Sequence, residues 1–383
     1  MAIVKYDEEK FFINELVVDE KNRFISGKIS NDVKNNIMFS KIQYQKRSID
    51  KMFVSDNGEE YTLFNCRFKI KNNDLTILFD SIIIGKKIND FFNEKCYEIS
   101  LSFDHTNFNI VDVEESLGKE IIFKRNQEVY KIFINFSPRK YTLNIFNSEN
   151  LPVKVMLDKL IEFYTFISFS IGQYYMIDKI VLKLKKFEKE IFYYPNLNSK
   201  YNIKRKDSFT SQVLFKLKEI DVSDTYNKWL LMRKKTHAIF DLYLVALADF
   251  QFEDISLSFM INILEGYSKV MHSYQLNKLK KYNKDHKKNG IDLRVILNKF
   301  YFQTNYSNLI FPISERKKYK ADTKLVNHRN YFDHLDKPRD RYYGHDCTVM
   351  FAKLNLIFRV QIFQDLGISL DINKIKKNIE KIK

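Results

Sequence analysis

The sequence predicts an α+β protein, in which a β-rich sandwich or barrel-like N-terminal domain precedes an all-α C-terminal domain. Up to about residue 150, apolar residues alternate with polar ones, and this period of two is typical of strands that bury one face. From Pro152 onwards, apolar residues recur every three or four positions, which is the period of a helix with one buried face. The chain therefore divides into a strand region and a helix region.

Several segments of the first region show the alternation that predicts strands. They are residues 23–30, 36–44, 61–70, 75–85, 97–103, 130–136 and 141–145. Asp56-Asn57-Gly58 and the polar run 71–74 mark turns between them. About seven or eight strands with short connections favour a sandwich or a barrel. A helix after Pro152 is expected to pack on this sheet, and the strand candidates 174–184 and 190–194 are expected to pair with each other.

The second region is expected to be helical throughout. The polar, basic run 196–207 marks a linker, so we expect a β-rich domain at 1–206, connecting helices at 207–250 and a helical domain at 251–383. Ser223-Asp224 and Asp254 are candidate N-caps, because their side chains accept hydrogen bonds from the first turn of a helix.

Further along this region, the patterns predict two more helices and two segments without helix. Residues 274–290 are predicted to form a loop, and residues 321–334 and 347–366 to form helices. Gly367 suits a left-handed cap at the end of the last helix. Residues 374–383 are expected to form a short basic tail.

Composition limits the function without deciding it. The chain has 383 residues, of which 45% are hydrophobic and 15% aromatic, so it can bury cores and is globular rather than disordered. Its formal net charge of +16 suits a nucleic-acid partner. The same charge would result if lysine simply occupied many solvent-exposed positions without a binding role. Three scattered cysteines without a C-x-x-C pair predict a reducing compartment.

We expect a cytoplasmic protein without a membrane partner. The first residues contain no apolar run of the kind that a signal peptide needs. The most apolar window, residues 160–182, is interrupted by Glu162, Gln173 and Asp178. It is therefore too polar to span a bilayer and is expected to lie in a core.

One stretch combines the side chains that phosphate chemistry needs. Arg329, Asn330 and His334 lie within six positions, at the end of the predicted helix 321–334 and shortly before Pro338. Arginine binds a phosphate bidentately and keeps its charge, and histidine exchanges a proton near neutral pH. Together they suit the anionic transition state of phosphodiester cleavage, and no metal ion or other cofactor is required.

Arg329-Asn330-x-x-x-His334 resembles the R-x4-6-H motif of HEPN domains. The runs 264–267 (LEGY) and 363–368 (FQDLGI) are similar to the ApeA-like HEPN family in particular. The resemblance covers the last third of the chain well and extends to the front half as a weaker likeness to that family's β-rich N-terminal domain. It implies an HEPN helical bundle with endoribonuclease activity in phage defence by abortive infection, in which the front domain senses a phage-derived trigger or gates the nuclease.

Helix geometry limits how Arg329 and His334 can meet. Residues five apart are rotated by about 140° on an ideal helix, so the two side chains diverge within a straight helix. Pro338 disfavours helix at Lys337, so either the helix frays near His334 or a second copy of the chain supplies one of the pair. The resemblance implies the latter, a composite cleft in a twofold homodimer.

The chemistry predicted for this pair is transesterification of RNA, with tRNA or another structured RNA as a possible substrate. His334 takes a proton from the ribose 2′-OH or gives one to the leaving 5′-oxygen, and Arg329 stabilises the charged phosphorane. Asn330 is expected to orient the histidine or the phosphate. The products would be a 2′,3′-cyclic phosphate and a 5′-OH end.

Other side chains are candidates for supporting roles. Glu265 can pair with Arg329 or tune His334, and is otherwise an exposed carboxylate. Tyr331 is a candidate for packing or for a contact in the site, and Asp333 for an auxiliary role. Two basic clusters suggest RNA contacts, because lysine and arginine supply the salt-dependent part of such affinity. The candidate RNA-binding residues are Lys280, Lys281, Lys317, Lys318, Lys320 and Lys324.

Three alternatives stay open at this level. In a purely structural role, Arg329 pairs with Asp333 or Asp336 while His334 caps a helix end. In a second class of function, a non-catalytic HEPN module binds RNA or a protein partner. A metal site is the rival chemistry, but its potential ligands match no zinc spacing. Those ligands are His328, His334, His345, Asp346 and Cys347.

Overall fold

The computed structural model describes most of the chain, which forms two compact units. The first unit comprises residues 1–105, 116–161 and 176–202, and the second comprises residues 106–115, 162–175 and 203–383. The described residues are 2–6, 9–19, 24–29, 49–71, 74–104, 120–125, 128–137, 140–171, 177, 179–187, 190–194, 214, 219–248, 253–282, 292–318, 320–334, 340–380 and 382. The strand candidate 36–44 and the linker 196–207 lie outside them.

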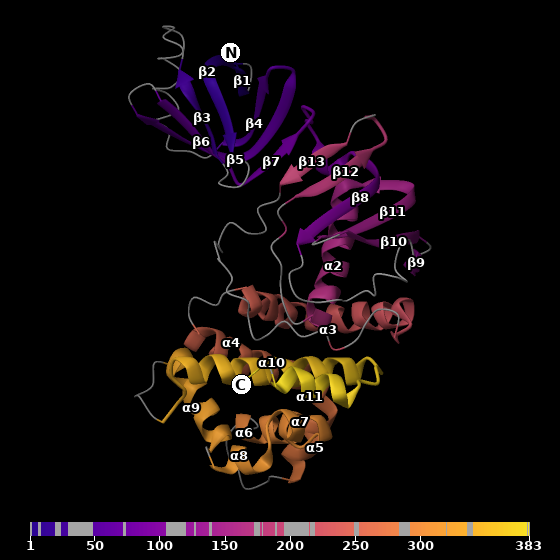
Figure 1. Ribbon diagram of the computed structural model, residues 1–383, viewed down its shortest axis with the longest axis vertical. Helices are drawn as coiled ribbons and strands as arrows, with labels where there is room; N and C mark the ends of the chain where they lie inside the picture. Colours follow the sequence, from indigo (N-terminus) through magenta and orange to yellow (C-terminus); the bar gives the residue numbers. More distant parts are fainter. Residues whose placement is uncertain are drawn as a thin grey trace. The chain divides into compact units, whose positions relative to one another are not determined.

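Six of the described strands in the first unit close into a ring (Figure 1). They are β1 (Ala2–Tyr6), β2 (Glu9–Asp19), β3 (Phe24–Ile29), β4 (Ile49–Asp56), β5 (Glu59–Lys71) and β6 (Asp74–Leu78). Neighbours are antiparallel in the order β1-β2-β3-β6-β5-β4, and β4 also pairs with β1, which closes the ring. A closed ring leaves no unpaired edge strand. The prediction of a barrel-like N-terminal domain is therefore confirmed.

The sheet continues from the ring because β5 is long enough to pair with two successive strands. Its second half pairs with β6 and its first half pairs with β7. From β7 the strand order is β7-β13-β12-β8-β11-β10-β9. These strands are β7 (Ser81–Ile84), β8 (Lys95–Asp104), β9 (Glu120–Arg125), β10 (Glu128–Ser137), β11 (Lys140–Pro152), β12 (Ile180–Leu184) and β13 (Ile191–Tyr194).

The expected alternation is correct for β10, where Tyr130 and Ile132 are buried and Lys131 is exposed. In β8 it is wrong at Tyr97, which is 40% exposed although it shares the parity of the buried Ile99. The pairing of β12 with β8 shifts register at this point. A bulge of this kind reverses which side chains face inward, so Cys96 is buried in place of Tyr97. The pairing predicted between the strands after the helix is confirmed by β12 and β13.

Helix α2 (Val153–Ile171) confirms the helix predicted after Pro152. In its first half, residues 154 and 158 are exposed while residues 156, 157 and 160 are buried, as expected for an amphipathic helix. Every residue from 163 to 170 is buried. The first part of the most apolar window is therefore core, as predicted. No described helix is long and apolar enough to cross a membrane.

The second unit is helical, so the predicted α+β fold class is confirmed. Its helices are α3 (Val222–Ala248), α4 (Glu253–Met271), α5 (Ser273–Tyr282), α6 (Leu293–Ile296), the π-helix η4 (Leu297–Phe302), α7 (Asn305–Ile310), α8 (Ile313–Lys318), α9 (Ala321–His334), α10 (His345–Asp365) and α11 (Ile372–Glu380). Helix α4 packs against α3, α9 and α10 (Figure 1). Aromatic rings fill the centre of the unit, where Phe169 lies 4.7 Å from Trp229 and 4.3 Å from Tyr243 between ring centroids.

Four local predictions are wrong. Asp221, rather than Ser223-Asp224, accepts the hydrogen bond from the first turn of α3. Asp254 lies inside α4. Residues 274–282 of the predicted loop belong to α5, and residues 374–380 of the predicted tail belong to α11. Helix α11 exists because packing buries Ile375 and Asn378, which the lysine-rich composition hides. Gly367 adopts the expected left-handed conformation, with φ +81°.

Candidate active site

Helix α9 carries the Arg-Asn-x-x-x-His motif and has the bounds that the sequence predicts, Ala321–His334. It begins with a hydrogen bond from the Lys324 amide to the Lys320 carbonyl. Ala321, Leu325 and His328 are fully buried and form its inner face. Arg329 and Asn330 follow this face and are half-buried. The helix therefore holds the motif at the border between core and solvent.

His328 joins α9 to the start of α4. Its Nε2 donates to the Asp254 carbonyl oxygen at 2.7 Å, because a carbonyl can only accept. Burial lowers the pKa of His328, so the ring is neutral in this contact. The Asp254 carboxylate lies 3.6 Å from Arg341, whose guanidinium lies 4.0 Å from the centre of the Tyr331 ring. Tyr331 therefore has the packing role that the sequence allowed.

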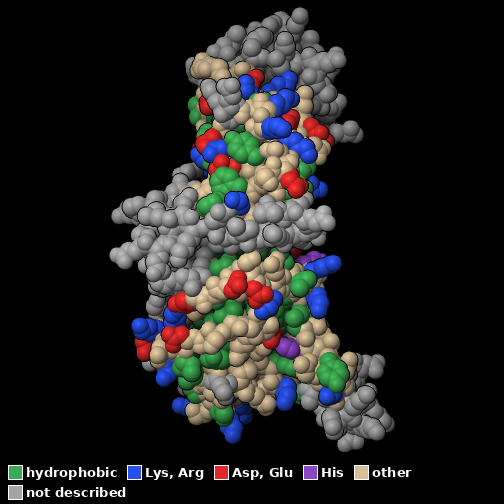
Figure 2. Space-filling view, turned by 90° about the vertical axis from the view of Figure 1, so that its right-hand side faces the viewer, with side chains coloured by type: hydrophobic (Ala, Val, Ile, Leu, Met, Phe, Trp, Pro, Cys, Tyr) green, Lys and Arg blue, Asp and Glu red, His purple; other side chains and the backbone are tan. Residues whose placement is uncertain are grey.

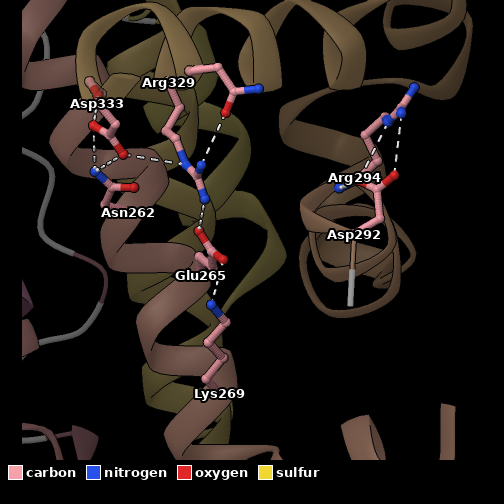
Figure 3. Close-up of polar contacts among 9 residues, drawn as sticks. Asn262, Glu265, Lys269, Asp292, Arg294, Arg329 and Asp333 are labelled. Carbon is pink, nitrogen blue, oxygen red and sulfur yellow. Dashed lines mark hydrogen bonds and ion pairs between the residues drawn. The ribbon is translucent and has the colours of Figure 1, made fainter. Parts of the chain in front are cut away.

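Arg329 contacts Glu265, Asp333 and Asn330. Its Nη2 donates to Glu265 at 2.7 Å, its Nε lies 3.4 Å from Asp333 Oδ2, and its Nη1 donates to Asn330 Oδ1 at 3.0 Å. Figure 3 shows the guanidinium extending from α9 towards Glu265 on α4. The Arg329 side chain is 18% exposed and that of Glu265 is 12% exposed. Two of the predicted partners of Arg329 are thus confirmed, and Asp336 lies outside the described residues.

Two further residues of α4 extend this set of contacts, and the sequence did not single them out. Lys269 Nζ lies 2.6 Å from Glu265 Oε1, and Asn262 Nδ2 donates to both Asp333 oxygens at 3.2 and 3.1 Å. Asn262 and Glu265 are three positions apart and Lys269 is four further on, so they share one face of α4. That spacing is the signal by which the sequence could have indicated them.

The four charged side chains of this cluster balance one another. Burial by itself raises the pKa of the Glu265 carboxyl, but hydrogen bonds from Lys269 and Arg329 outweigh it, so the pKa lies below its usual value. Glu265 is therefore ionised at neutral pH and keeps the Arg329 guanidinium in place. A half-buried guanidinium that is held in one orientation can bind an oxyanion at the solvent border.

The position of His334 follows from its backbone alone, because its side chain lies outside the described residues. Helix α9 continues to His334, so the fraying considered from the sequence is not seen. Five residues along a regular helix correspond to about 140° of rotation. Positions 329 and 334 therefore do not share one face of α9.

The candidate RNA-binding lysines differ in their surroundings. Lys317, Lys318 and Lys320 are exposed at the end of α8 and the start of α9, whereas Lys324 lies 3.2 Å from Asp340. Lys280 and Lys281 lie in α5, and their side chains are outside the described residues. On the face shown in Figure 2, Lys and Arg side chains of the helical unit are scattered among acidic and apolar ones.

Two of the candidate ligands of the alternative metal site are buried in the structure. The Nε2 of His328 is occupied by the Asp254 carbonyl, and Cys347 is buried. Within the described part of the chain, no three His, Cys, Asp or Glu side chains gather as metal ligands.

The family comparison matches the part of the chain that contains this cluster. Residues 260–372 match the family model described as Apea-like HEPN. These residues form an Apea-like HEPN domain. The match begins in α4, contains Glu265 and the whole of α9 and α10, and ends at the first residue of α11. No curated protein and no solved structure gives a significant match. The resemblance seen in the last third of the sequence is thus confirmed for residues 260–372, which match the model of this HEPN family.

Replacing the Glu265 carboxylate is expected to loosen the HEPN domain by a measurable amount. Glu265→Gln should lower the free energy of unfolding at pH 7 by about 2 kcal/mol, because a half-buried carboxylate with two cationic donors is lost. Urea unfolding, followed by the fluorescence of the single tryptophan, Trp229, measures the difference. Glu380→Gln, at an exposed position of α11, is the matched control and should change it by less than about 0.5 kcal/mol.

The difference in the free energy of unfolding between wild type and Glu265→Gln is also expected to depend on pH. The pKa of Glu265 in the folded protein lies below its ordinary value of 4.5, so the stabilisation is complete above pH 4.5 and disappears as the pH falls through the lowered pKa. The difference between wild type and Glu265→Gln should therefore shrink in acid. Equal unfolding midpoints at pH 7 would contradict the role given to Glu265.

Proposed function

We propose that the protein is a metal-independent endoribonuclease that cleaves RNA by transesterification at a site composed across a homodimer. The observation that carries the proposal is the orientation of Arg329 by Glu265 beside Asn330, in an HEPN domain with the complete Arg-Asn-x-x-x-His motif. The family resemblance supports a role in abortive infection, with a phage-derived trigger acting on the N-terminal domain. Our proposed limits for the parts are 1–206, 207–250 and 251–383.

In the proposed reaction, the ribose 2′-oxygen attacks the adjacent phosphorus and the bond from phosphorus to the 5′-oxygen breaks. His334 takes the proton of the 2′-OH or delivers one to the leaving 5′-oxygen. Arg329 stabilises the charge that develops on the phosphorane. Its contact with Asp333, at 3.4 Å, is the longest of the three, and is the one that a substrate phosphate would replace. Asn330, whose carboxamide oxygen faces Arg329, supports the guanidinium.

The helical backbone of α9 supports the proposed dimer. Since α9 is helical up to His334, positions 329 and 334 of one copy lie on different faces of the helix. A twofold axis beside α9 would place the Arg329 of one chain against the His334 of the other, and the same symmetry would generate a second, identical site.

A non-catalytic HEPN module is the second candidate. It is favoured by the two carboxylates around Arg329, which neutralise the guanidinium in the structure. In this alternative the cluster only joins α4 to α9, and RNA or a protein partner binds elsewhere.

Cleavage of RNA in EDTA tests the proposal. Purified wild-type protein is incubated with total RNA, and the new ends are examined for 2′,3′-cyclic phosphate and 5′-OH groups. We expect cleavage by wild type and none by His334→Ala. A 2′-deoxy substitution at a mapped cleavage position should block cleavage there. Wild-type protein that leaves total RNA intact, with and without extract from phage-infected cells, would favour the non-catalytic module.

A further inference from the structure

A cleft of 570 Å³ opens in the HEPN domain at the N-terminal end of α9. Its walls come from η4, α7, α8 and the first turn of α9. Clefts of this size hold small ligands or single units of a polymer. The Arg329 cluster does not line it, so it is a separate feature of the domain.

One wall of the cleft contains a guanidinium in a fixed position. Arg316 donates from Nη1 to the Phe302 carbonyl and from Nη2 to Asn308 Oδ1, both at 2.5 Å. Its guanidinium lies 5.0 Å from the centre of the Phe302 ring. These contacts use part of a planar group with five donors. A guanidinium held in this way is preorganised to bind an anion.

The charge of the cleft favours an anionic ligand. Lys317 and Lys320 line it together with Arg316, and both lysines are exposed. Asp322 is the acidic residue among the residues that line it. The cleft therefore has an excess of positive charge, unlike the balanced cluster around Arg329. Phosphate groups bind to lysine and arginine in this kind of setting.

The remaining polar side chains suit a nucleobase. Asn298, Gln303 and Thr323 line the cleft beside the apolar Ile313. Amide and hydroxyl groups can donate to and accept from the edge of an unstacked base, and single-stranded RNA is recognised in this way. A phosphate on the lysines and a base against the amides together describe one nucleotide.

The cleft and the Arg329 cluster are aligned along α9. Asp322 lines the cleft, and Arg329 lies seven positions further along the same helix. Seven residues correspond to nearly two full turns and to about 10.5 Å along the axis, so both positions face one side of α9. A stacked strand advances by about 3.4 Å per nucleotide. The interval therefore matches about three nucleotides of a strand that follows α9.

We propose that this cleft binds one nucleotide of the RNA strand, about three nucleotides from the phosphate that Arg329 contacts. The inference rests on the proposed ribonuclease function. It assigns the place where the enzyme holds its RNA substrate at a distance from the bond that is cleaved. Arg316, Lys317 and Lys320 bind the phosphate, and the amide side chains contact the base. The proposed ligand is a segment of an RNA strand. A free nucleotide has the same phosphate and base groups, so it is the alternative ligand that the experiment must exclude.

Binding of an uncleavable RNA tests this proposal independently of catalysis. The probe is a fluorescein-labelled RNA decamer with 2′-O-methyl groups at every position, and its anisotropy is measured with full-length protein at several salt concentrations. Lys317→Glu/Lys320→Glu should weaken binding about tenfold or more, and should reduce the slope of log affinity against log salt by about 1.4, since each phosphate contact on a single strand contributes about 0.7. The matched control is Lys234→Glu/Lys235→Glu, at two exposed positions of α3, which should leave the slope unchanged.

A second variant covers the case in which the charge reversal does not fold. Gln303→Trp narrows the cleft at an exposed position without changing charge, and should also weaken binding of the decamer. Wild-type affinity and slope in both variants would overturn the proposal. 5′-AMP and unlabelled decamer are also compared as competitors of the labelled decamer. If 5′-AMP displaces the labelled decamer at a lower concentration than the unlabelled decamer does, the proposal is overturned, because the cleft would then be a site for free nucleotides.

Failure of the proposed function gives a different result from failure of this inference. If wild type binds the decamer through the cleft but cleaves no RNA, the ribonuclease proposal is wrong and the cleft is still an RNA site. If RNA is cleaved while the cleft variants bind and cleave as wild type does, the enzyme stands and the subsite is wrong.

Discussion

Co-expressed Arg329→Ala and His334→Ala chains are expected to recover about one quarter of wild-type ribonuclease activity, although each variant alone is inactive. In a twofold dimer with composite sites, a mixed dimer contains one site with both residues intact and one site with neither. Random pairing makes about half of the dimers mixed, and each mixed dimer has half of the normal sites. The recovery follows from symmetry alone.

The loss in each single variant is expected to be large. Removing a positioned acid or base costs about 10² to 10⁴-fold in rate, and removing a donor to a developing oxyanion costs about 10² to 10³-fold. The contrast between these losses and one quarter of full activity is large enough to measure with a crude RNA substrate. No recovery in affinity-purified mixed dimers would show that Arg329 and His334 do not act across subunits.

Matched controls for this experiment lie in the same domain. Arg294 pairs with Asp292, and Figure 3 shows that pair without a contact to the Arg329 cluster. His345 is exposed at the start of α10. Arg294→Ala and His345→Ala, alone or co-expressed, should keep wild-type activity. Their loss of activity would indicate a general effect of removing charge from the domain.

Replacement of Arg359 is expected to cause the largest loss of stability in the helical unit. Arg359 lies on α10 and is fully buried. Its Nε donates to the Phe169 carbonyl at 2.6 Å, and its Nη2 donates to the Ser170 carbonyl. These carbonyls belong to the last turn of α2, where no further turn of helix can satisfy them. Burial lowers the pKa of Arg359 to about 10, so the guanidinium is still charged at neutral pH and suits a helix C-terminus.

Arg359→Ala should lower the free energy of unfolding by about 4 kcal/mol, because it leaves a cavity and removes a donor from each of two buried carbonyls. Within the described part of the chain, the Ser170 carbonyl then keeps only the hydrogen bond from the Leu214 amide, at 3.4 Å. In Arg359→Met, the methionine side chain fills most of the cavity. The free energy of unfolding should therefore fall by only about 2 kcal/mol, and this decrease measures the missing hydrogen bonds. Trp229 is a local reporter, since it packs against Phe169 in the same core. Arg294→Met, at an exposed position, should change the fluorescence midpoint little. An Arg359→Met protein as stable as wild type would show that the contacts with α2 contribute nothing.

Local patterns predicted the elements well where one period dominated. Helix α9 was predicted with its observed bounds, because its apolar positions and the later proline are visible in the sequence. In α3, by contrast, the apolar stripe expected from the sequence includes Leu242 and Leu244. A kink at Thr236 interrupts the helix, and Leu242 and Leu244 are only half-buried while Phe240 and Tyr243 are buried. No local pattern marks this kink in advance.

The candidate site was predictable in part. The sequence indicated Arg329 and the possible partners Glu265 and Asp333, and the structure brings all three together. It did not indicate Asn262, Lys269 or Arg341. Their contacts depend on how α4 packs against α9 and on which residues follow α9. The side chain of His334 lies outside the described residues, so its meeting with Arg329 stays a prediction.

The sequence by itself determined where strands give way to helices and where an HEPN motif lies, because periodicity and motif spacing are properties of neighbouring residues. Only the tertiary structure decided that β4 closes a barrel with β1 and that Glu265 holds Arg329. These pairs are brought together by the packing of whole elements across long stretches of chain. Such packing depends on the summed burial of many side chains, and no short pattern records it.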